Sequence, residues 1–291
     1  MKCYYHRDMD GKCAAAIVYD KFHSELGSYL QMIDIDYKDD FDPNSISKDE
    51  VVWILDFSFH PEVMEQILKI TQDITWIDHH KSAMEYKYSK ELKGIRDINF
   101  AGCELTWKFL HPNDTMPRIV EMLGRYDIWD FSKYGDDLNR LQSGIRLYDT
   151  SPQSISWNIW LSTKYSGQDL DGIGYCMDEL NVLLDEGSIA LKYRNRTWAS
   201  LIKAWGFFAT FEGYKAICCN AGSVSSQMFD TITEDYDVMM PFIFDGKQWT
   251  ISVYTKKDNI DCAELAKKYG GGGHKKAAGF QCKELPFKYD K

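Results

Sequence analysis

The chain has 291 residues and a formal net charge of −10 at pH 7. That length is enough for two domains of ordinary size, and a hydrophobic share of 44% is too high for a disordered chain. A protein that coats long nucleic acid usually has a strongly basic face, so the acidic balance argues against tight binding of long duplex nucleic acid. The same argument does not apply to a short nucleotide.

Eight cysteines are scattered along the chain, and no two of them form a Cys-x-x-Cys pair. A structural zinc site is therefore not expected. The N-terminal residues do not resemble a signal peptide, and no run approaches the roughly 18 apolar residues of a membrane span. Reduced thiols and a cytoplasmic protein that does not bind membranes are the simplest expectation.

The first part of the chain alternates strand and helix patterns. Strands are predicted over residues 2–6, 29–35, 51–55 and 74–77, and helices over residues 12–22 and 62–71. The strand at 51–55 is apolar on both faces, as strands of parallel sheets are. This alternation predicts βαβ units and a parallel sheet, whose ligands bind beyond the carboxyl ends of its strands.

Helices and then short strands dominate the rest of the chain. Further helices are predicted over residues 103–110, 117–126, 155–161, 173–202 and 262–269, and strands over residues 207–211, 216–219, 241–244 and 249–254. We therefore predict an α/β protein with a catalytic domain at residues 1–145, a helical connector at 146–202 and a smaller α/β domain at 203–291. The charged tail after Gln281 is predicted to be frayed.

Carboxylates and histidines occur where the predicted strands end. Ile77-Asp78-His79-His80 closes an apolar run, and burying three such side chains is costly unless something binds them. Imidazole and carboxylate suit divalent Zn, Mn or Fe. The sequence therefore predicts a metal site at the end of this strand.

Three further motifs supply candidate ligands. His6, Asp8 and Asp10 alternate, so in an extended chain they would project to the same side. Asp56 follows an apolar strand, and Asp127 lies in Arg-Tyr-Asp-Ile-Trp-Asp, where Asp130 is an alternative ligand. A solvated acidic loop would explain the first motif alone and a helix cap would explain Asp56 alone, but together the motifs indicate a two-metal centre.

A glycine run near the C-terminus is the second strong signal. Gly270-Gly271-Gly272-Gly273-His274-Lys275 allows the backbone to approach an anion closely and to aim N–H groups at it. The glycine spacing is not that of a Walker A loop. A flexible linker is the alternative, but linkers of this kind are rich in serine and do not carry His-Lys-Lys.

These motifs, in this order, resemble those of the DHH phosphoesterase superfamily, in particular members with a C-terminal DHHA1-type domain. Asp78-His79-His80 is similar to the motif that names the superfamily, and the segment from Gly270 to Phe280 is similar to the GGGGHxxAAGF signature of the second domain. The resemblance covers nearly the whole chain. It implies a DHH domain, a helical connector and a DHHA1-type domain, with the active site in the cleft between the two domains.

The resemblance also implies a role for each motif residue. His6, Asp8 and Asp56 would hold one Mn²⁺, whereas Asp10, Asp56, His79 and Asp127 would hold a second, with Asp56 bridging the two ions. His80 would contact the substrate phosphate, and Asp78 would orient a histidine. The residues that would bind phosphate in the second domain are Gly271, Gly272, Gly273, His274 and Lys275.

Within the superfamily, the His-x-Asp-x-Asp spacing differs from the longer spacing of family II pyrophosphatases. The small-substrate branch, which includes oligoribonucleases (nanoRNases) and phosphoadenosine-phosphate phosphatases, is the best match. It implies hydrolysis of short oligonucleotides or small nucleotides by a hydroxide that two metal ions activate. A phosphoanhydride hydrolase acting on pyrophosphate or polyphosphate and a non-catalytic nucleotide-binding regulator are the alternatives, and the sequence leaves a homodimer open.

Overall fold

The computed structural model describes residues 1–81, 83–162 and 179–289. The described chain forms two compact units, Met1–Leu191 and Lys192–Lys291. The boundaries at residues 145 and 202 stay a prediction. No helix of the described part of the chain is long and apolar enough to cross a membrane.

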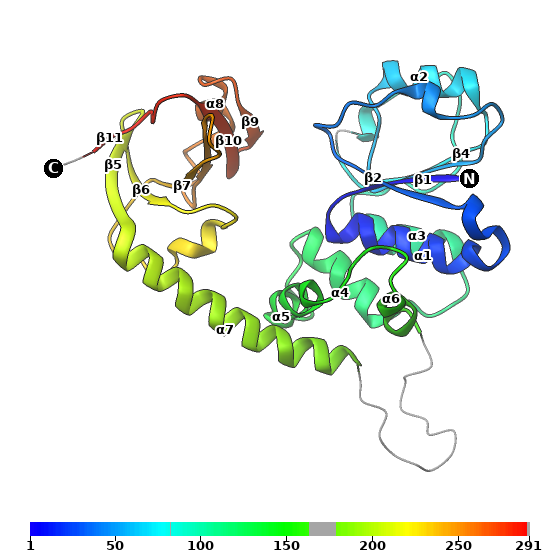
Figure 1. Ribbon diagram of the computed structural model, residues 1–291, viewed down its shortest axis with the longest axis horizontal. Helices are drawn as coiled ribbons and strands as arrows, with labels where there is room; N and C mark the ends of the chain where they lie inside the picture. The colour runs from blue at the N-terminus through cyan, green and yellow to red at the C-terminus, as the bar shows by residue number, and fades with distance from the viewer. Residues whose placement is uncertain (82, 163–178, 290–291) are drawn as a thin grey trace, which may run out of the picture. The chain divides into compact units, whose positions relative to one another are not determined.

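The first unit is built on a parallel sheet, as the sequence predicts (Figure 1). Its strands are β1 (Lys2–His6), β2 (Gln31–Ile35), β3 (Val52–Leu55) and β4 (Ile74–Ile77). They lie in the order β2-β1-β3-β4, and every adjacent pair is parallel. All four carboxyl ends therefore meet at the same edge of the sheet.

Helices cover both faces of this sheet, which explains why its central strands are apolar throughout. On one face lie α1 (Met9–Leu26), α3 (Gly102–Leu110) and α4 (Arg118–Asp127), and on the other lies α2 (Pro61–Ile70) (Figure 1). Alternate residues of one strand belong to different cores: Trp53 and Leu55 pack with α1 and α3, whereas Val52 and Ile54 pack with α2.

The remaining helices of this unit are α5 (Asp137–Gly144), α6 (Ile155–Trp160) and the first part of α7 (Glu179–Trp205). Helix α5 was not predicted from the sequence. The part of the predicted helix 173–202 that precedes residue 179 lies outside the described residues. Short 3-10 helices complete the chain: η1 (Gly27–Tyr29), η2 (Pro43–Ser45), η3 (Ala83–Glu85), η4 (Ile145–Leu147) and, in the second unit, η6 (Ser226–Phe229).

The second unit is built on a mixed sheet with α8 (Cys262–Lys267) on one face and the end of α7 on the other. Its strands are β5 (Gly206–Phe211), β6 (Tyr214–Asn220), β7 (Val238–Phe244), β8 (Trp249–Tyr254), β9 (Gly272–His274), β10 (Ala277–Cys282) and β11 (Lys288–Tyr289). They lie in the order β11-β5-β6-β7-β8-β10-β9. Among the described strands of this sheet, only β6 and β7 pair in parallel.

The prediction of a frayed tail is wrong. Lys288 and Tyr289 pair antiparallel with Thr210 and Ala209 of β5, so these residues add an edge strand to the sheet.

The strands β9 and β10 were not predicted from the sequence, because glycine and alanine rarely indicate strands.

Two glycines let α5 and α7 cross with their backbones in contact. A β-carbon at Gly187 would lie 1.8 Å from the carbonyl oxygen of Arg140, and one at Gly144 would lie 2.0 Å from that of Leu183. Neither gap can accept an added methyl group without moving a backbone. This crossing therefore depends on glycine on both helices.

Gly187→Ala tests this crossing. Alanine normally stabilises a helix by about 1 kcal/mol relative to glycine, but here the clash should reverse the sign and cost about 1–3 kcal/mol. We expect a lower melting temperature in thermal denaturation. Ser200→Ala, at an exposed position of the same helix, should leave the melting temperature nearly unchanged; equal melting temperatures for the two variants would contradict the crossing.

Candidate metal centre

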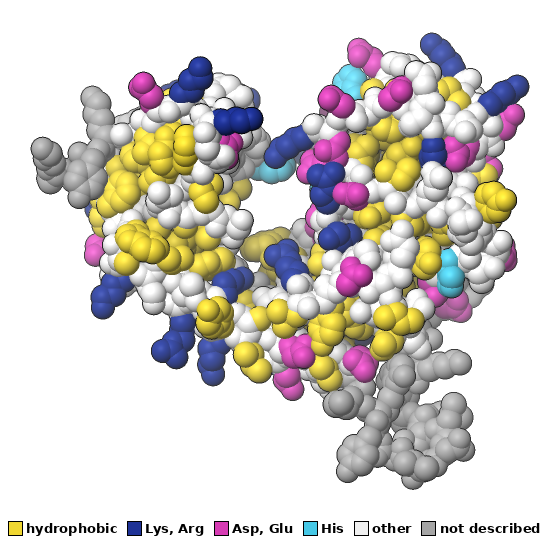
Figure 2. All heavy atoms as spheres, viewed as in Figure 1, with side chains coloured by type: hydrophobic (Ala, Val, Ile, Leu, Met, Phe, Trp, Pro, Cys, Tyr) yellow, Lys and Arg dark blue, Asp and Glu magenta, His cyan; other side chains and the backbone are white. Residues whose placement is uncertain are grey.

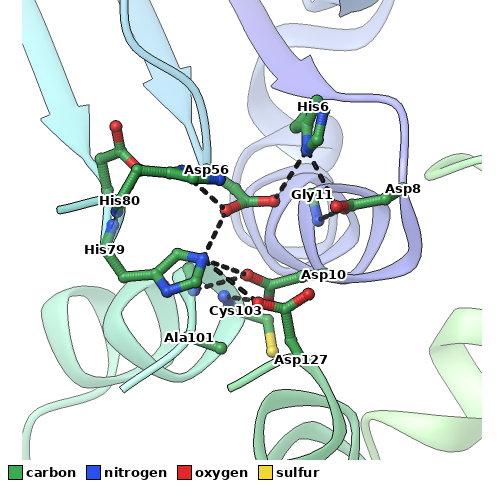
Figure 3. A network of polar contacts seen from close by, with 12 residues as sticks. His6, Asp8, Asp10, Gly11, Asp56, His79, His80, Ala101, Cys103 and Asp127 are labelled. Atoms are coloured by element: carbon green, nitrogen blue, oxygen red, sulfur yellow. Dashed lines mark hydrogen bonds and ion pairs between the residues drawn. The ribbon is translucent and has the colours of Figure 1, made fainter. Parts of the chain in front are cut away.

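The predicted ligands lie close together at the carboxyl edge of the parallel sheet (Figure 3). His6 is the last residue of β1, Asp56 directly follows β3, and Asp78-His79-His80 directly follow β4. Because these strands are adjacent and parallel, their ends bring residues far apart in sequence together.

The other three ligand candidates lie at or near the ends of helices. Asp127 is the last residue of α4, and Asp8 caps the N-terminus of α1, where its side chain accepts a hydrogen bond of 2.9 Å from the Gly11 N–H. Asp10 lies in the first turn of α1, so the prediction that it lies in an extended segment is wrong. It still reaches the centre because the helix begins at Met9, directly beyond the sheet edge.

Asp56 lies between two groups of ligand candidates. One of its carboxylate oxygens, Oδ2, lies 3.5 Å from His6 Nδ1, which in turn lies 2.9 Å from an Asp8 oxygen. The other, Oδ1, lies 3.2 Å from His79 Nε2. The two oxygens of one carboxylate thus face different sides of the site, as a bridging ligand requires.

His79 joins Asp56 to the remaining candidates. Its Nε2 atom also lies 3.2 Å from Asp127 Oδ2 and 3.7 Å from Asp10 Oδ2. Three sets of donor atoms each lie within 4.8 Å of one another: His6, Asp8 and Asp56; Asp56, His79 and His80; Asp10, His79 and Asp127. All six predicted ligands fall within these sets, while their roles as ligands stay predictions.

The charges of this cluster are not balanced by the described protein. No lysine or arginine among the described residues forms an ion pair with the carboxylates of the centre; the histidines are their partners. Burial raises the pKa of Asp56 and that of Asp10 well above the usual range, and neighbouring carboxylates raise them further. Burial and the charges of Asp10 and Asp8 likewise raise the pKa of Asp127 to about 7. Removing a proton from these groups becomes favourable when a cation binds them.

The pKa of His6, the histidine of the first motif, is also raised, which for an imidazole favours the charged form. Burial alone would lower the pKa of His6, but the neighbouring carboxylates of Asp56 and Asp8 outweigh it and raise this pKa to about 10. A proton on His6 therefore takes the place that a cation would take between these carboxylates.

These observations fit divalent metal ions. Both carboxylate oxygens of Asp56 are buried, and neither has a hydrogen-bond partner among the described residues. Asp56 is also only 1% exposed. A buried carboxylate without donors is costly, and an ion ligated by imidazole and carboxylate relieves that cost.

Asp56 also has an unusual backbone. Its φ angle of 52° lies in the left-handed region, which costs a non-glycine residue energy and persists only where the surrounding structure enforces it. Here the Asp56 N–H donates to the carbonyl of Ile77, which keeps the turn after β3 against the end of β4. The strained conformation aims the carboxylate into the centre.

Asp78 holds His80 rather than joining the ligands. It is completely buried, and its Oδ1 accepts the N–H groups of His79 and His80 and lies 2.8 Å from His80 Nδ1. Burial would lower the pKa of His80, but the hydrogen bond to Asp78 and its charge raise it. With Nδ1 engaged, Nε2 is the ring nitrogen of His80 that remains for a ligand.

The N-terminus of α3 forms the floor of the centre, a feature that the sequence analysis missed. Asp10 accepts hydrogen bonds of 2.6 and 2.8 Å from the N–H groups of Gly102 and Cys103. These bonds orient the Asp10 carboxylate and place it at the positive end of a helix. A β-carbon at Gly102 would lie 2.7 Å from the Asp56 β-carbon, so only glycine fits there.

A buried ion pair anchors the helix that carries Asp127. Glu104, 2% exposed, pairs with Arg125 and accepts the Ala101 N–H at 3.0 Å. It thereby ties the start of α3 to the last turn of α4, two residues before Asp127. Arg125 was visible in the sequence as part of the fourth motif, but nothing there indicated its partner.

The structure separates the two candidates of the fourth motif. Asp130 hydrogen-bonds with Ser132 and lies 3.5 Å from Arg125, so it belongs to the turn after α4. Asp127 is the one that lies beside His79.

The predicted phosphate-binding residues lie in the second unit. Gly272, Gly273 and His274 form the edge strand β9, which pairs with β10, and Lys275 lies in the turn between the two strands. Gly271 precedes β9, and its N–H donates to Ala266 of α8. The side chains of His274 and Lys275 are exposed. Their roles stay predictions.

Comparison with known proteins places the glycine run in a family. Residues 220–290 match the family described as the DHHA1 domain. A curated relative, the uncharacterized protein R106 of Acanthamoeba polyphaga mimivirus, is 23% identical in an alignment of 242 residues that covers 78% of this chain and 52% of the relative. The chain thus spans about half the length of that relative.

Solved structures share the fold. One is an exonuclease RecJ bound to manganese, with a TM-score of 0.50, 14% identity and coverage of 96% of this chain and 84% of that one. The family match covers residues 220–290, and the likeness to this exonuclease shows a shared fold. The pGpG-specific phosphodiesterase PggH of Vibrio cholerae also matches, with a TM-score of 0.49, 13% identity and coverage of 97% and 93%.

Gly102→Ala tests the floor of the metal centre. The added methyl group would displace Asp56 or Asp10, so we expect the affinity for Mn²⁺ to fall at least about tenfold, since a shift of about 1 Å in a site can cost that much. Isothermal titration calorimetry with MnCl₂ measures this loss.

Gly272→Ala is the matched control, because a β-carbon there meets nothing within 4 Å. It should bind Mn²⁺ as the unchanged protein does. An unchanged affinity in Gly102→Ala would mean that the start of α3 does not support the centre.

Proposed function

We propose that the protein is a Mn²⁺-dependent phosphodiesterase that hydrolyses short oligonucleotides or small nucleotides. The observation that carries the proposal is Asp56, a buried carboxylate whose two oxygens face different sets of ligand candidates. A single-metal site has no need of such a residue, whereas a two-metal centre does. The RecJ structure of the same fold contains manganese, which supports Mn²⁺ as the ion.

In the proposed reaction, His6, Asp8 and Asp56 would hold one ion, and Asp10, Asp56, His79 and Asp127 would hold the other. When bound, divalent ions at these residues would lower the pKa of a water molecule and neutralise charge on the phosphoryl oxygens. The protein contributes the rigid arrangement. The strand ends, the α1 N-terminus and the Glu104–Arg125 pair fix the ligands before substrate arrives.

His80 is the proposed contact to the substrate phosphate. Asp78 fixes the ring through Nδ1 and favours the protonated imidazole, so Nε2–H is available to donate to a phosphoryl oxygen. In this role His80 neutralises charge without binding a metal. Asp78 acts on the reaction only by positioning and charging His80.

Aromatic side chains near the centre support a nucleotide over an inorganic phosphate chain. The Tyr37 ring, 54% exposed, lies with its centroid 5.8 Å from that of His6 and 6.2 Å from that of His80. Trp129, two residues after Asp127, is 66% exposed and has a φ angle of 61°, an unfavourable conformation for tryptophan. An exposed ring beside a phosphate site offers a base a surface to stack on.

The second unit supplies the remaining proposed contacts. We assign phosphate binding to the exposed β9 edge, with the backbone of Gly272 and Gly273 and the side chains of His274 and Lys275. The N–H of Gly271, which was also predicted to bind phosphate, already donates to Ala266. An edge strand leaves N–H groups on one side without a neighbouring strand, and such groups together with a lysine suit an anion.

A hydrolysis assay with Mn²⁺ tests the proposal. The substrates are a 5′-phosphorylated dinucleotide, a cyclic mononucleotide, 3′-phosphoadenosine 5′-phosphate and tripolyphosphate, with an EDTA-treated sample as the metal-free control. We expect the dinucleotide to have the highest kcat/KM. Highest activity on tripolyphosphate would move the protein to the phosphoanhydride hydrolases, and no metal-dependent activity on any substrate would favour a nucleotide-binding regulator.

Asp56→Asn should reduce kcat on the dinucleotide by at least about a thousandfold, because one carboxylate serves both ions. Asparagine tolerates the left-handed backbone, so the substitution changes the charge and leaves the turn in place. Asp130→Asn is the matched control, since Asp130 lies in the turn after α4, outside the centre. Wild-type kcat in Asp56→Asn, measured with saturating Mn²⁺, would contradict the two-metal assignment.

Tyr37→Ala should raise KM for the dinucleotide about tenfold, because losing one stacked base costs about 1–3 kcal/mol. KM for tripolyphosphate should stay within about twofold. Tyr37→Phe should retain the wild-type KM, and Tyr29→Ala, which removes another exposed tyrosine, serves as the control. Equal effects on both substrates would mean that Tyr37 does not contact a base.

A further inference from the structure

The second half of α7 has a composition unlike the rest of this acidic protein. No aspartate or glutamate occurs between Glu186 and Glu212, whereas the same stretch contains Lys192, Arg194, Arg196 and Lys203. The chain as a whole has 44 acidic residues against 34 basic ones. A local excess of positive charge in such a background attracts anionic ligands to that surface.

Three of these cations lie on one face of the helix. Lys192 and Arg196 are four residues apart, and Lys203 follows Arg196 by seven, so their side chains share one side. All three are exposed. We call them the basic stripe; by the helical rise it extends roughly 16 Å. In Figure 2, dark-blue side chains gather along this part of α7.

The opposite face of the helix is buried. Trp198, Leu201 and Ile202 pack with the sheet of the second unit. Arg194 lies away from the basic stripe, with its guanidinium 4.3 Å from the Trp198 ring centroid and a 2.9 Å hydrogen bond to Gln227. The stripe is thus held rigidly outward by a packed helix, and Arg194 has a structural role instead.

The stripe cations have no acidic partners among the described residues, in contrast to other cations of the unit. Lys256 lies 2.9 Å from Asp230, and Lys257 lies 2.7 Å from Asp237. No such ion pair is found for Lys192, Arg196 or Lys203 within the described part of the chain. Like charges four residues apart also destabilise a helix slightly, so the arrangement lowers the stability of α7 in the absence of an anion.

We propose that the basic stripe binds the phosphate backbone of a single-stranded oligonucleotide. A phosphodiester chain carries negative charge at regular intervals, which matches cations repeated along a helix face. Tyr193 directly follows Lys192 in the helix and is 75% exposed, so its ring is free to stack on a base of a strand bound along the stripe. Cations together with an aromatic ring are what sequence-independent binding of single strands uses.

A membrane surface is the competing partner. A helix that lies on a membrane needs an apolar face toward the lipid, but the apolar face of this part of α7 packs against the sheet of its own unit. The observations therefore favour the oligonucleotide. The inference builds on the proposed function, because it names a second contact to the same class of substrate.

Fluorescence anisotropy of the full chain in EDTA, with a labelled single-stranded RNA of about 12 nucleotides, tests the stripe without turnover. The variant replaces Lys192, Arg196 and Lys203 by glutamine. At about 50 mM salt we expect its affinity to fall at least tenfold, and the slope of log K against log salt to drop by about 2, as the loss of three phosphate contacts to a single strand implies. Tyr193→Ala should weaken binding about fivefold and leave that slope unchanged.

The matched control replaces Lys256, Lys257 and Lys267 by glutamine. It removes the same charge from the same unit, but each of these lysines already has an acidic partner. We expect less than about a twofold loss. Equal losses in both triple variants, or no loss in the stripe variant, would overturn the proposal.

Vesicles of phosphatidylcholine with phosphatidylserine provide the last comparison. Loss of vesicle binding in the stripe variant with unchanged RNA binding would assign the stripe to a membrane and overturn the proposal. Because binding is measured without metal, the result is independent of catalysis. An unchanged stripe variant together with an active enzyme would overturn this inference alone, and an inactive enzyme that binds RNA through the stripe would overturn only the proposed function.

Discussion

The buried carboxylate of Asp56 is the constraint on which the first unit depends. It sits at the end of a central strand in a left-handed conformation, almost without solvent contact and without a hydrogen-bond donor among the described residues. Such a group is costly unless a cation binds it. The neighbouring carboxylates share this problem, because burial and mutual repulsion raise the pKa of Asp10 and that of Asp127. A divalent ion relieves all of these costs at once.

The elements around Asp56 keep this unfavourable arrangement in place. Parallel strands bring His6, Asp56 and His79 to one edge. The start of α3 donates two backbone N–H groups to Asp10, and Gly102 leaves just enough room for it. The packing of the two cores on either side of the sheet thus stabilises the first unit enough to keep these carboxylates close together. The second unit also carries charges without partners of opposite sign among the described residues. These are the cations of the basic stripe of α7.

Much of the first unit could be predicted from the sequence, because its strands and helices have strong apolar patterns. The four strands, the parallel sheet and the motifs at its edge follow from those patterns and from the rule that ligands bind at carboxyl ends. Elements with weaker sequence patterns were not predicted correctly. Helix α5 was missed, Asp10 was assigned to an extended chain although it lies in a helix, and β9 and β10 were missed because glycine and alanine do not indicate strands.

The sequence by itself determined which residue types are candidates for the chemistry and where along the chain they occur, since strand ends, caps and glycine runs are local patterns. Only the tertiary structure decided how these residues meet. It placed Asp127 rather than Asp130 beside His79, turned the oxygens of Asp56 toward different partners, and paired Glu104 with Arg125. These contacts depend on how helices cross and on backbone strain, both of which arise from packing between segments distant in sequence. Such packing produces no periodic pattern from which it could be predicted.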